Sequence, residues 1–418
     1  MQLHFLGGAR EVGRSAILLK DHRSFMLDYG VKLDHKTEYP TGLPNIDACV
    51  ISHAHLDHSG FLPAIYNEQF IPTFGTAPTL ELSKLLLEDS INIAKKEHMQ
   101  PKFHKRQIRA LENKFVGLNY NATQHFGDYD ITLHDAGHIA GSAITLIERQ
   151  KAKENRRIVY TGDLKLHEQM LHGGAEVVKS DVLIIESTYA TRHHPDRDEL
   201  TRNFINEINS VLESGGTALL PVFAVGRSQE ILAVLQKHGL ASSTYVDGMA
   251  RAATKIVTGH PKFVRNHNLL SGAIKESMWI EDMSARKGAL EGPSIILTTA
   301  GMLNGGPVLH YITKLNENSR IFLTGYQVEG TNGRRLLDGK SIFVDDMEVN
   351  IRTPVSFYDF SAHAGMNELY EYVNRSAPQT VVCVHGDKEN AESFAETLRG
   401  EGFDAYAPAV GDTIKLGD

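Results

Sequence analysis

The chain has 418 residues, which is too many for one ordinary hydrophobic core, so we expect two domains or one domain with a large insertion. Hydrophobic residues make up 41% and charged residues 22%, as is typical of a soluble globular protein. The formal net charge of −8 argues against a protein that coats nucleic acid through bulk positive charge, but it leaves room for a local basic groove.

Neither the apolar runs nor the first residues resemble those of a membrane or secreted protein. No apolar run approaches the ~20 residues of a membrane span, and the N-terminus enters a strand-like segment without the layout of a signal peptide. The two cysteines, Cys49 and Cys383, cannot form a disulfide framework, and each lies in an apolar run. We therefore expect a cytoplasmic protein with no membrane partner and with buried free thiols.

Short β-rich runs separated by turns fill the first third of the chain. Strands are expected at residues 3–6, 15–20, 25–27 and 48–52, and later at 131–134, 143–148, 158–161 and 182–186. An amphipathic pattern at 79–98 predicts a long helix. Basic residues at 95–96 and from 102 to 109 form a patch in a segment expected to be helical, and they are interpreted as a solvated helix face, with an RNA contact as the alternative. This order of elements favours sheets covered by helices, an αββα-type sandwich.

The pattern changes at residues 191–197, which form a polar loop that contains proline. A helix expected at 198–213 leads to a buried strand at 217–221, a helix that ends near 238 and a strand at 243–246. Strands at 294–298 and 320–323 continue the alternation up to about residue 344, which predicts a parallel βαβ module. A strand at 381–384 and a helix at 390–399 return to the earlier pattern.

The densest group of metal-binding residue types lies at residues 53–58, with the sequence His-Ala-His-Leu-Asp-His. It follows an apolar run directly and offers His53, His55, Asp57 and His58. Imidazole suits Zn²⁺ and similar ions, and a carboxylate completes or bridges such sites. The alternative is a solvated turn that happens to be rich in histidine.

Three later apolar strands also deliver a polar residue at their ends: His138, Asp163 and His385. Strand ends hold a side chain more rigidly than loops do, as a preorganised metal site requires. Taken singly, each of these residues is more often a turn former. Together with the motif at 53–58, they favour a metal site.

Seven segments together resemble a known set of motifs. Four look like the ordered motifs of the metallo-β-lactamase fold: 25–30 (Phe-Met-Leu-Asp-Tyr-Gly), 53–58, 137–138 (Gly-His) and 161–163 (Thr-Gly-Asp). Three resemble those of its nucleic-acid-processing β-CASP branch: 185–189 (Ile-Glu-Ser-Thr-Tyr), 360–365 (Phe-Ser-Ala-His-Ala-Gly) and 384–386 (Val-His-Gly). The resemblance covers nearly the whole chain. It is strongest to the short archaeal and bacterial relatives of the cleavage and polyadenylation specificity factor endonuclease subunit, followed by RNase J.

This resemblance implies an α/β fold, in which an αββα metallo-β-lactamase sandwich carries an inserted α/β β-CASP domain. The sandwich would comprise residues 1–190 and 351–418, and the inserted domain residues 191–350. The resemblance also implies two Zn²⁺ ions as cofactors, which share a hydroxide and clamp a scissile phosphate so that water attacks phosphorus in line. The implied ligands are His53, His55 and His138 for one ion, Asp57, His58 and His385 for the other, and Asp163 as the bridge.

The resemblance further assigns a proton donor to the site. His363 would be the general acid for the leaving oxygen, and Glu186 would hold its tautomer and position. Asp57 counts among the catalytic residues as well as the ligands. Asp28 is interpreted as a carboxylate that orients a ligand histidine, with an ordinary strand-end turn residue as an equal alternative.

Candidate substrate-binding residues lie mainly in the segment expected to form the inserted domain. A glycine-rich turn after an apolar strand could line a phosphate with its backbone N–H groups, and arginine, tyrosine and glutamine side chains in nearby segments could grip the RNA backbone or stack on bases. Taken singly, each is more often an ordinary surface residue. The candidates are Arg227, Gly301, Met302, Tyr326, Gln327 and, beside His363, Ser361.

The leading hypothesis is a zinc-dependent ribonuclease that hydrolyses single-stranded RNA in 3′-end processing, maturation or decay, with endonuclease activity favoured. In the family that the chain resembles, a histidine at the position of His385 accompanies RNA-processing members. A 5′→3′ exoribonuclease of the RNase J type is the alternative. More distant alternatives are an inactive scaffold subunit and a small-molecule metallo-hydrolase. The resemblance also suggests a homodimer and participation in an RNA-processing or decay complex.

Overall fold

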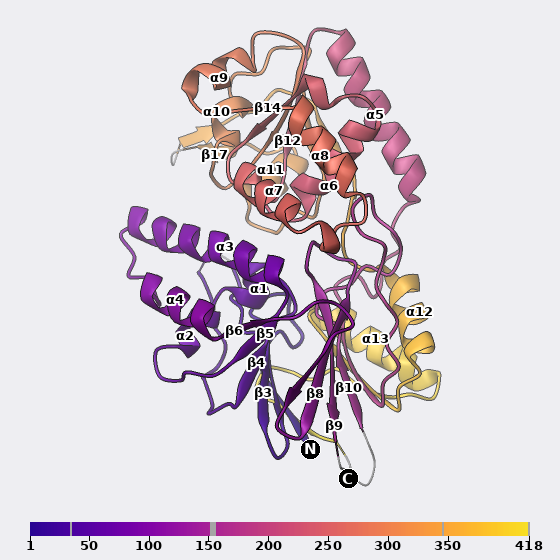
Figure 1. Ribbon diagram of the computed structural model, residues 1–418. Coiled ribbons are helices and arrows are strands. Elements are labelled where there is room, and N and C mark those ends of the chain that lie inside the picture. Colours follow the sequence, from indigo (N-terminus) through magenta and orange to yellow (C-terminus); the bar gives the residue numbers. More distant parts are fainter. Residues whose placement is uncertain (34–35, 151–155, 345–346, 417–418) are drawn as a thin grey trace. The chain divides into compact units, whose positions relative to one another are not determined.

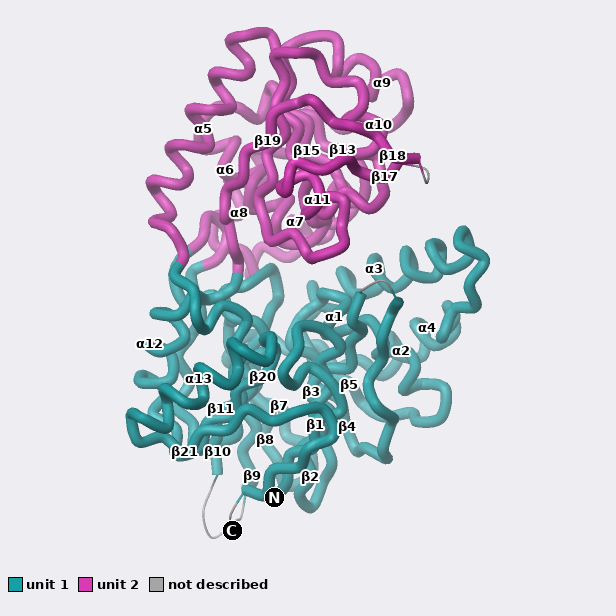
Figure 2. The backbone as a smooth tube through the Cα atoms, turned by 180° about the vertical axis from the view of Figure 1, so that it is seen from behind, with its two compact units in different colours: residues 1–168, 173–193, 363–418 teal, residues 169–172, 194–362 magenta. Residues whose placement is uncertain are grey.

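The computed structural model describes residues 1–33, 36–150, 156–344 and 347–416 (Figure 1). The chain forms two compact units, coloured separately in Figure 2. Unit 1 comprises Met1–Glu168, Gly173–His193 and His363–Asp418, and unit 2 comprises Gln169–His172 and His194–Ala362. The borders 191–350 expected for the inserted domain thus lie close to those of unit 2, but the domain assignment itself stays a prediction.

Two seven-stranded sheets form the centre of unit 1. The first has the order β22-β1-β2-β3-β4-β5-β6, and the second has the order β21-β20-β11-β10-β9-β8-β7. The strands of the first sheet are β1 (Gln2–Gly7), β2 (Ala16–Lys20), β3 (Ser24–Leu27), β4 (Ala48–Val50), β5 (Thr73–Gly75), β6 (Phe115–Gly117) and β22 (Thr413–Lys415). Those of the second are β7 (Thr123–Phe126), β8 (Tyr129–Asp135), β9 (Ala143–Arg149), β10 (Arg157–Tyr160), β11 (Val182–Glu186), β20 (Thr380–Val384) and β21 (Asp404–Tyr406).

The alternation of side chains along the strands separates the core of unit 1 into layers. In β10, Ile158 and Tyr160 belong to the core between the two sheets, whereas Val159 belongs to the core on the other face of the second sheet. Because successive side chains of a strand point to opposite faces, one apolar run serves both layers. Strands that are apolar throughout are therefore expected where both faces are covered.

Helices cover the outer faces of both sheets in unit 1. The helices that pack on the first sheet are α1 (Leu56–Ser59), α2 (Leu62–Ile65), α3 (Ala77–Lys96) and α4 (Lys105–Lys114). Those on the second sheet are α12 (Met366–Ser376) and α13 (Lys388–Gly400). The resulting order of layers is helix, sheet, sheet, helix, which confirms the predicted αββα sandwich.

Unit 2 is built on a six-stranded sheet of order β14-β13-β15-β12-β16-β19, in which every pair of neighbours is parallel. Its strands are β12 (Thr217–Pro221), β13 (Thr244–Asp247), β14 (Met278–Trp279), β15 (Ser294–Thr298), β16 (Arg320–Leu323) and β19 (Val355–Phe357). A hairpin of β17 (Ile342–Val344) and β18 (Met347–Val349) is separate from this sheet. The parallel βαβ module predicted from the alternating pattern is thereby confirmed.

Helices connect the strands of unit 2. The helices are α5 (Arg197–Glu213), α6 (Arg227–Lys237), α7 (Ala250–Gly259), α8 (His267–Glu276), α9 (Met283–Gly288), α10 (Val308–Ile312) and α11 (Asn332–Leu337), with 3₁₀ turns at Ala241–Ser243 and Pro261–Phe263. The predicted helix at 198–213 corresponds to α5, and the predicted strands at 294–298 and 320–323 have the bounds of β15 and β16.

Two other expectations concern burial and length. Cys49 and Cys383 are buried free thiols, as predicted. The helix predicted at 79–98 is α3, which begins and ends two residues earlier. Its start is set by Thr76, whose side chain accepts a hydrogen bond from the backbone N–H of Thr79 and caps the helix. Among the described residues, no helix combines the length and the apolar composition that crossing a membrane would take.

Candidate metal centre and active site

The motif at residues 53–58 lies where the chain leaves the first sheet of unit 1. Strand β4 is fully buried and pairs in parallel with β3 and β5, so that its carboxyl end emerges between two neighbouring strands. His53 follows this strand after two further buried residues, and Asp57 and His58 belong to the short helix α1. His53 and His58 have no exposed surface, which fixes their rings within the fold.

The second sheet delivers the remaining residues from one edge. His138 follows β8, Asp163 follows β10, Glu186 ends β11 and His385 follows β20. Strands β10, β11 and β20 are parallel, and β8 and β10 are each antiparallel to β9, so all four run in the same direction. Their carboxyl ends therefore meet at one edge of the sheet.

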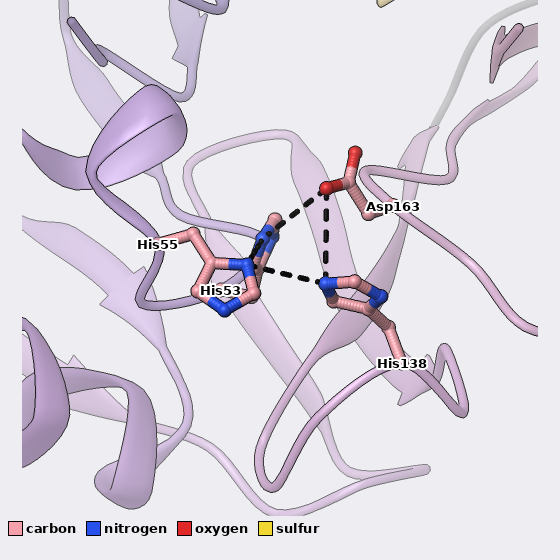
Figure 3. Close-up of side chains that lie close together, drawn as sticks. All are labelled: His53, His55, His138 and Asp163. Atoms are coloured by element: carbon pink, nitrogen blue, oxygen red, sulfur yellow. Dashed lines mark hydrogen bonds and ion pairs between the residues drawn. The ribbon is translucent and has the colours of Figure 1, made fainter. Parts of the chain in front are cut away.

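Three histidines and one aspartate form the first cluster (Figure 3). Nδ1 of His55 lies 3.1 Å from Nε2 of His53 and 3.2 Å from Nε2 of His138. Oδ2 of Asp163 lies 3.4 Å from Nε2 of His53 and 3.8 Å from Nε2 of His138. In Figure 3 the ring nitrogens and the carboxylate point toward a common centre.

The second cluster uses the other oxygen of the same aspartate. Oδ1 of Asp163 lies 3.3 Å from Nε2 of His58 and 3.5 Å from Nε2 of His385. Oδ2 of Asp57 lies 3.6 Å from Nε2 of His385 and 3.9 Å from Nε2 of His58. Asp163 therefore faces one group of ligand atoms with each of its two carboxylate oxygens.

The donor atoms fit metal ions of zinc size. Zn–N bonds of about 2.0–2.1 Å in a tetrahedral site separate the ligand atoms by about 3.3 Å, and the contacts within the two clusters range from 3.1 to 3.9 Å. In addition, Nε2 of His58, Nε2 of His385 and both oxygens of Asp163 are buried without a hydrogen-bond partner among the described residues. Such atoms are costly unless a ligand satisfies them.

Charge and burial act in opposite directions on these groups. Burial raises the pKa of Asp163, but the positive charges of His385 and His58 outweigh it and hold that pKa well below its ordinary value. Burial lowers the pKa of His53 well below its ordinary value, and the charge of His58 adds to this effect. Asp163 is therefore ionised and His53 neutral, which are the states in which these groups bind a metal ion. Burial lowers the pKa of His58, but the negative charges of Asp163 and Asp57 outweigh it and raise that pKa well above its ordinary value, so His58 would release a proton on binding a metal ion.

Asp28 lies behind the second cluster and does not face its centre. Its Oδ2 lies 2.7 Å from Nδ1 of His58 and accepts hydrogen bonds of 2.7 Å from the hydroxyl groups of Ser52 and Tyr160. Its Oδ1 accepts from the backbone N–H of Ser52 at 2.7 Å. The carboxylate is fully buried, so it fixes the ring of His58 and with it the direction of Nε2.

Two residues of the site have a backbone conformation that is unusual for a side chain larger than hydrogen. Asp28 and His385 have φ angles of 59° and 47°, and each comes directly after a strand. The backbone N–H of Asp28 donates to the carbonyl of Val50, and that of His385 donates to the carbonyl of Gly8. Strained residues persist where their surroundings fix them, and they gather at functional sites.

Gly162 lets the Asp163 turn approach the first sheet. A Cβ atom on this residue would lie 2.5 Å from Cβ of Ser52, and its φ angle is 53°. Any other residue at position 162 would therefore push Asp163 away from His53.

His363 and Glu186 form a pair beside Asp163. Nδ1 of His363 lies 3.0 Å from Oε2 of Glu186, which is fully buried, and 3.9 Å from Oδ2 of Asp163. Burial lowers the pKa of His363, but the negative charges of Glu186 and Asp163 outweigh it and raise the pKa to about 9. Glu186 also accepts the backbone N–H of Leu164 at 2.7 Å, which ties His363 to the turn that carries Asp163.

The other candidate residues belong to unit 2. Arg227 begins α6, Gly301 and Met302 follow β15, and Tyr326 and Gln327 follow β16. Tyr326 is exposed, whereas Gln327 is buried and its amide nitrogen donates to the carbonyls of Gly301 and Gly325. Gln327 thus joins two of the turns. Ser361 is buried in unit 2, two residues before His363, which belongs to unit 1.

Several residues that hold the site together carry no signal in the sequence. The hydroxyl of Ser15 lies 2.8 Å from Nδ1 of His385, although 370 positions separate the two residues. Tyr160 occupies an ordinary strand position, and its hydroxyl reaches Asp28 from the other sheet. Only Ser52, which directly precedes His53, stands close enough to the motif to be considered from the sequence.

Three family models match the chain. Residues 1–208 match the model described as Anti-Pycsar protein Apyc1, residues 228–336 match the Beta-Casp domain, and residues 348–408 match the Zn-dependent metallo-hydrolase RNA specificity domain. A crystal structure of a protein of unknown function from Enterococcus faecalis covers 99% of both chains with a TM-score of 0.62. At 16% sequence identity, this likeness concerns the fold alone.

Curated relatives match over nearly the whole chain. The Probable RNase MJ4 of Methanocaldococcus jannaschii is 38% identical to this chain, and the match covers 100% of each of the two chains. RNase aCSPSF2 of Saccharolobus solfataricus is 35% identical over 99% of this chain and 85% of its own. The Transcription termination factor FttA of Methanothermobacter thermautotrophicus is 36% identical over 99% and 72%, respectively. The chain therefore belongs to the family of β-CASP ribonucleases that are similar to the cleavage and polyadenylation specificity factor.

Proposed function

We propose that this protein is a zinc-dependent ribonuclease that hydrolyses phosphodiester bonds of single-stranded RNA. The observation that carries the proposal is the position of Asp163, whose two oxygens face two separate groups of ligand atoms at 3.3 to 3.8 Å. The names of the relatives, which include two RNases, support RNA as the substrate.

The residues of the proposed centre divide into two ligand sets. His53, His55 and His138 would hold one Zn²⁺, and Asp57, His58 and His385 the other, with Asp163 between them. When bound, a pair of such ions supplies Lewis-acid chemistry, which stabilises charge on a phosphate and makes water a nucleophile near neutral pH. Asp28 would keep Nε2 of His58 directed toward the centre through its contact with Nδ1.

Proton transfer to the leaving oxygen is assigned to His363. Its Nδ1 lies against the buried carboxylate of Glu186, so the proton is delivered from Nε2. The same carboxylate favours the charged imidazolium, and therefore His363 carries a proton to deliver at neutral pH. Ser361, Arg227, Gly301, Met302, Tyr326 and Gln327 are proposed to contact the RNA.

The proposal extends to the biological setting. We assign the protein to RNA 3′-end processing, maturation or decay in the cytoplasm, with endonuclease activity preferred over 5′→3′ exonuclease activity. A homodimer and membership of an RNA-processing complex belong to the same proposal, by analogy with the family.

End-labelled RNA tests the reaction. Purified protein with zinc is incubated with 5′-labelled and 3′-labelled single-stranded RNA, and the first products are sized. Long fragments from both labels indicate an endonuclease, and mononucleotides from the 5′ label indicate an exonuclease. No cleavage of either RNA in the presence of zinc would overturn the proposal and favour a scaffold or a small-molecule hydrolase.

A further inference from the structure

Three turns of unit 2 lie next to one another at the carboxyl ends of its central strands. Strand β12 is hydrogen-bonded to β15 on one side and to β16 on the other, and all three are parallel. Their carboxyl ends lead into residues 222–226, 299–306 and 324–327. In open parallel sheets, this edge is the place where ligands bind.

Two glycines allow these turns to approach Phe223 closely. A Cβ atom on Gly301 would lie 3.0 Å from the backbone nitrogen of Phe223 and 3.0 Å from the carbonyl carbon of Val222. A Cβ atom on Gly325 would lie 3.5 Å from Cε2 of the Phe223 ring and 3.9 Å from Nε of Arg227. The phenyl ring and the guanidinium group therefore both lie close to Gly325.

The exposure of Phe223 contrasts with that of its neighbours. Val222 and Val225 are 1% and 3% exposed, whereas Phe223 keeps 37% of its surface in solvent. Tyr326, which directly follows Gly325, is 46% exposed. The turns thus present aromatic surface beside Arg227, a half-buried residue whose Nε and Nη1 atoms are covered, although apolar residues on both sides of Phe223 are buried.

Aromatic rings beside a cationic group suit single-stranded nucleic acid. Every nucleobase has a π-face that stacks on an aromatic side chain without regard to sequence, and arginine binds the phosphate between bases. We propose that Phe223 is the stacking platform for one unpaired base of the RNA substrate and that Arg227 contacts the adjoining phosphate. This inference rests on the proposed ribonuclease function and adds a residue and a ligand group to it.

The test measures RNA binding apart from cleavage. Full-length protein is titrated into fluorescein-labelled single-stranded RNA in the presence of a chelator, and fluorescence anisotropy gives the dissociation constant. We expect Phe223→Leu, which keeps an apolar side chain but removes the π-face, to bind about 5- to 150-fold more weakly. Phe223→Trp should retain wild-type affinity. The matched control is Phe70→Leu, which removes a 67% exposed phenyl ring of unit 1 and should leave affinity unchanged.

A second probe separates stacking from a general loss of affinity. It is an oligonucleotide of the same length whose sugar–phosphate backbone carries no bases. The wild type should bind RNA more tightly than this probe. In Phe223→Leu the ratio of the two affinities should fall by the same factor as the affinity for RNA, because binding of the probe without bases should not change. Equal affinity of Phe223→Leu and wild type, or an equal loss for both probes, would overturn the stacking role.

Cleavage assays with zinc distinguish this inference from the function on which it rests. If the wild type fails to cleave RNA but Phe223→Leu still loses the preference for bases, the ribonuclease proposal fails and the binding site stands. If the wild type cleaves RNA and Phe223→Leu keeps both its affinity for RNA and its preference for bases, the stacking proposal fails and the ribonuclease proposal stands. When both proposals are correct, Phe223→Leu raises KM more than it lowers kcat.

Discussion

The ammonium group of Lys165 lies 2.6 Å from Oε2 of Glu368, and only 11% and 7% of the two side chains are exposed. The pair joins the segment after Asp163 to the first turn of α12, which follows His363. Glu368 also accepts the backbone N–H of His167 at 3.0 Å and that of Gly365 at 2.9 Å. This buried ion pair therefore helps to hold together the two segments that carry Asp163, the proposed bridging carboxylate, and His363, the proposed acid.

Removing the cation should destabilise unit 1 strongly. In Lys165→Met the carboxylate of Glu368 stays buried without its partner, and breaking such a pair costs about 3–5 kcal/mol of unfolding free energy. The matched control is Lys84→Met, which breaks the solvent-exposed pair of Lys84 with Glu112 and should cost at most about 1 kcal/mol. Chemical denaturation followed by circular dichroism measures both losses, and equal losses would contradict the role of the buried pair.

The same pair predicts how stability depends on pH. Burial raises the pKa of Glu368, but Lys165 and the backbone N–H groups outweigh it and hold the pKa below its ordinary value of 4.5. The stabilisation is therefore present above pH 4.5 and is lost as the pH falls through the lower, folded-state pKa. The double variant Lys165→Met, Glu368→Gln lacks this titrating carboxyl group. Its free energy of unfolding should therefore fall less than that of the wild type as the pH is lowered from 5 through the folded-state pKa of Glu368. Parallel pH curves for the two proteins would count against this account.

His53, His138, Asp163 and His385 could be singled out from the sequence because each lies within three residues of the end of a short apolar strand. Such strands can be recognised in the sequence as short, mainly apolar runs, as in β10 and β20. The carboxyl ends of parallel strands then meet at one edge of the sheet. The parallel module of unit 2 could be predicted for the same reason, since β12, β15 and β16 each contain a run of three buried apolar residues. The local sequence pattern is therefore enough to predict a strand where that strand is buried on both faces.

The remainder depends on contacts between distant positions. Strand β6 has three residues, and none of them is fully buried, so it carries no pattern of its own. Lys165 and Glu368 are 203 positions apart. From the sequence alone, each is expected to be an ordinary charged residue at the surface, and only the fold shows that they form a buried pair. Phe223 reads as a core residue because its neighbours are apolar, and only the packed turns reveal that it is exposed.

Asp28 should control metal affinity without binding the metal. Asp28→Asn keeps the shape of the side chain but removes the charge that faces Nδ1 of His58, so this ring loses its fixed tautomer and direction. We expect zinc affinity of one of the two sites to fall about 10- to 100-fold, as measured by competition with a chromophoric chelator. Asp21→Asn, which alters a carboxylate bonded to the hydroxyl of Tyr129, is the control and should bind zinc normally. Unchanged affinity in Asp28→Asn would reduce Asp28 to a strand-end turn residue.

His363→Ala should separate chemistry from metal binding. Without the proton donor, cleavage should slow about 10²- to 10⁴-fold, because general acid catalysis contributes that much. Zinc content, measured by atomic emission, should stay at the wild-type value. Loss of zinc together with activity would make His363 a ligand, which its distance of 3.9 Å from Asp163 also permits. His193→Ala serves as the control, since this residue lies outside all three groups of metal-binding residues found in the described chain.

Removal of the metal should lower stability as well as activity. Nε2 of His58, Nε2 of His385 and both oxygens of Asp163 are buried without hydrogen-bond partners among the described residues, so a bound ion relieves a cost that the apo-protein carries. At a zinc concentration 1,000 times the dissociation constant, each site adds about 4 kcal/mol to the unfolding free energy. Thermal melts with and without chelator measure this difference. Zn²⁺ should restore the melting temperature and Mg²⁺ should not, because the donors are mainly imidazoles.

Asp163→Asn provides the control for that experiment. The substitution removes the charge that the two ligand sets share but keeps the size of the side chain, so chelation should change its melting temperature far less than that of the wild type. If the variant and the wild type respond equally to chelator, the metal binds elsewhere on the protein. If Mg²⁺ restores stability as well as Zn²⁺ does, oxygen ligands dominate the site, and the histidine-based assignment is wrong.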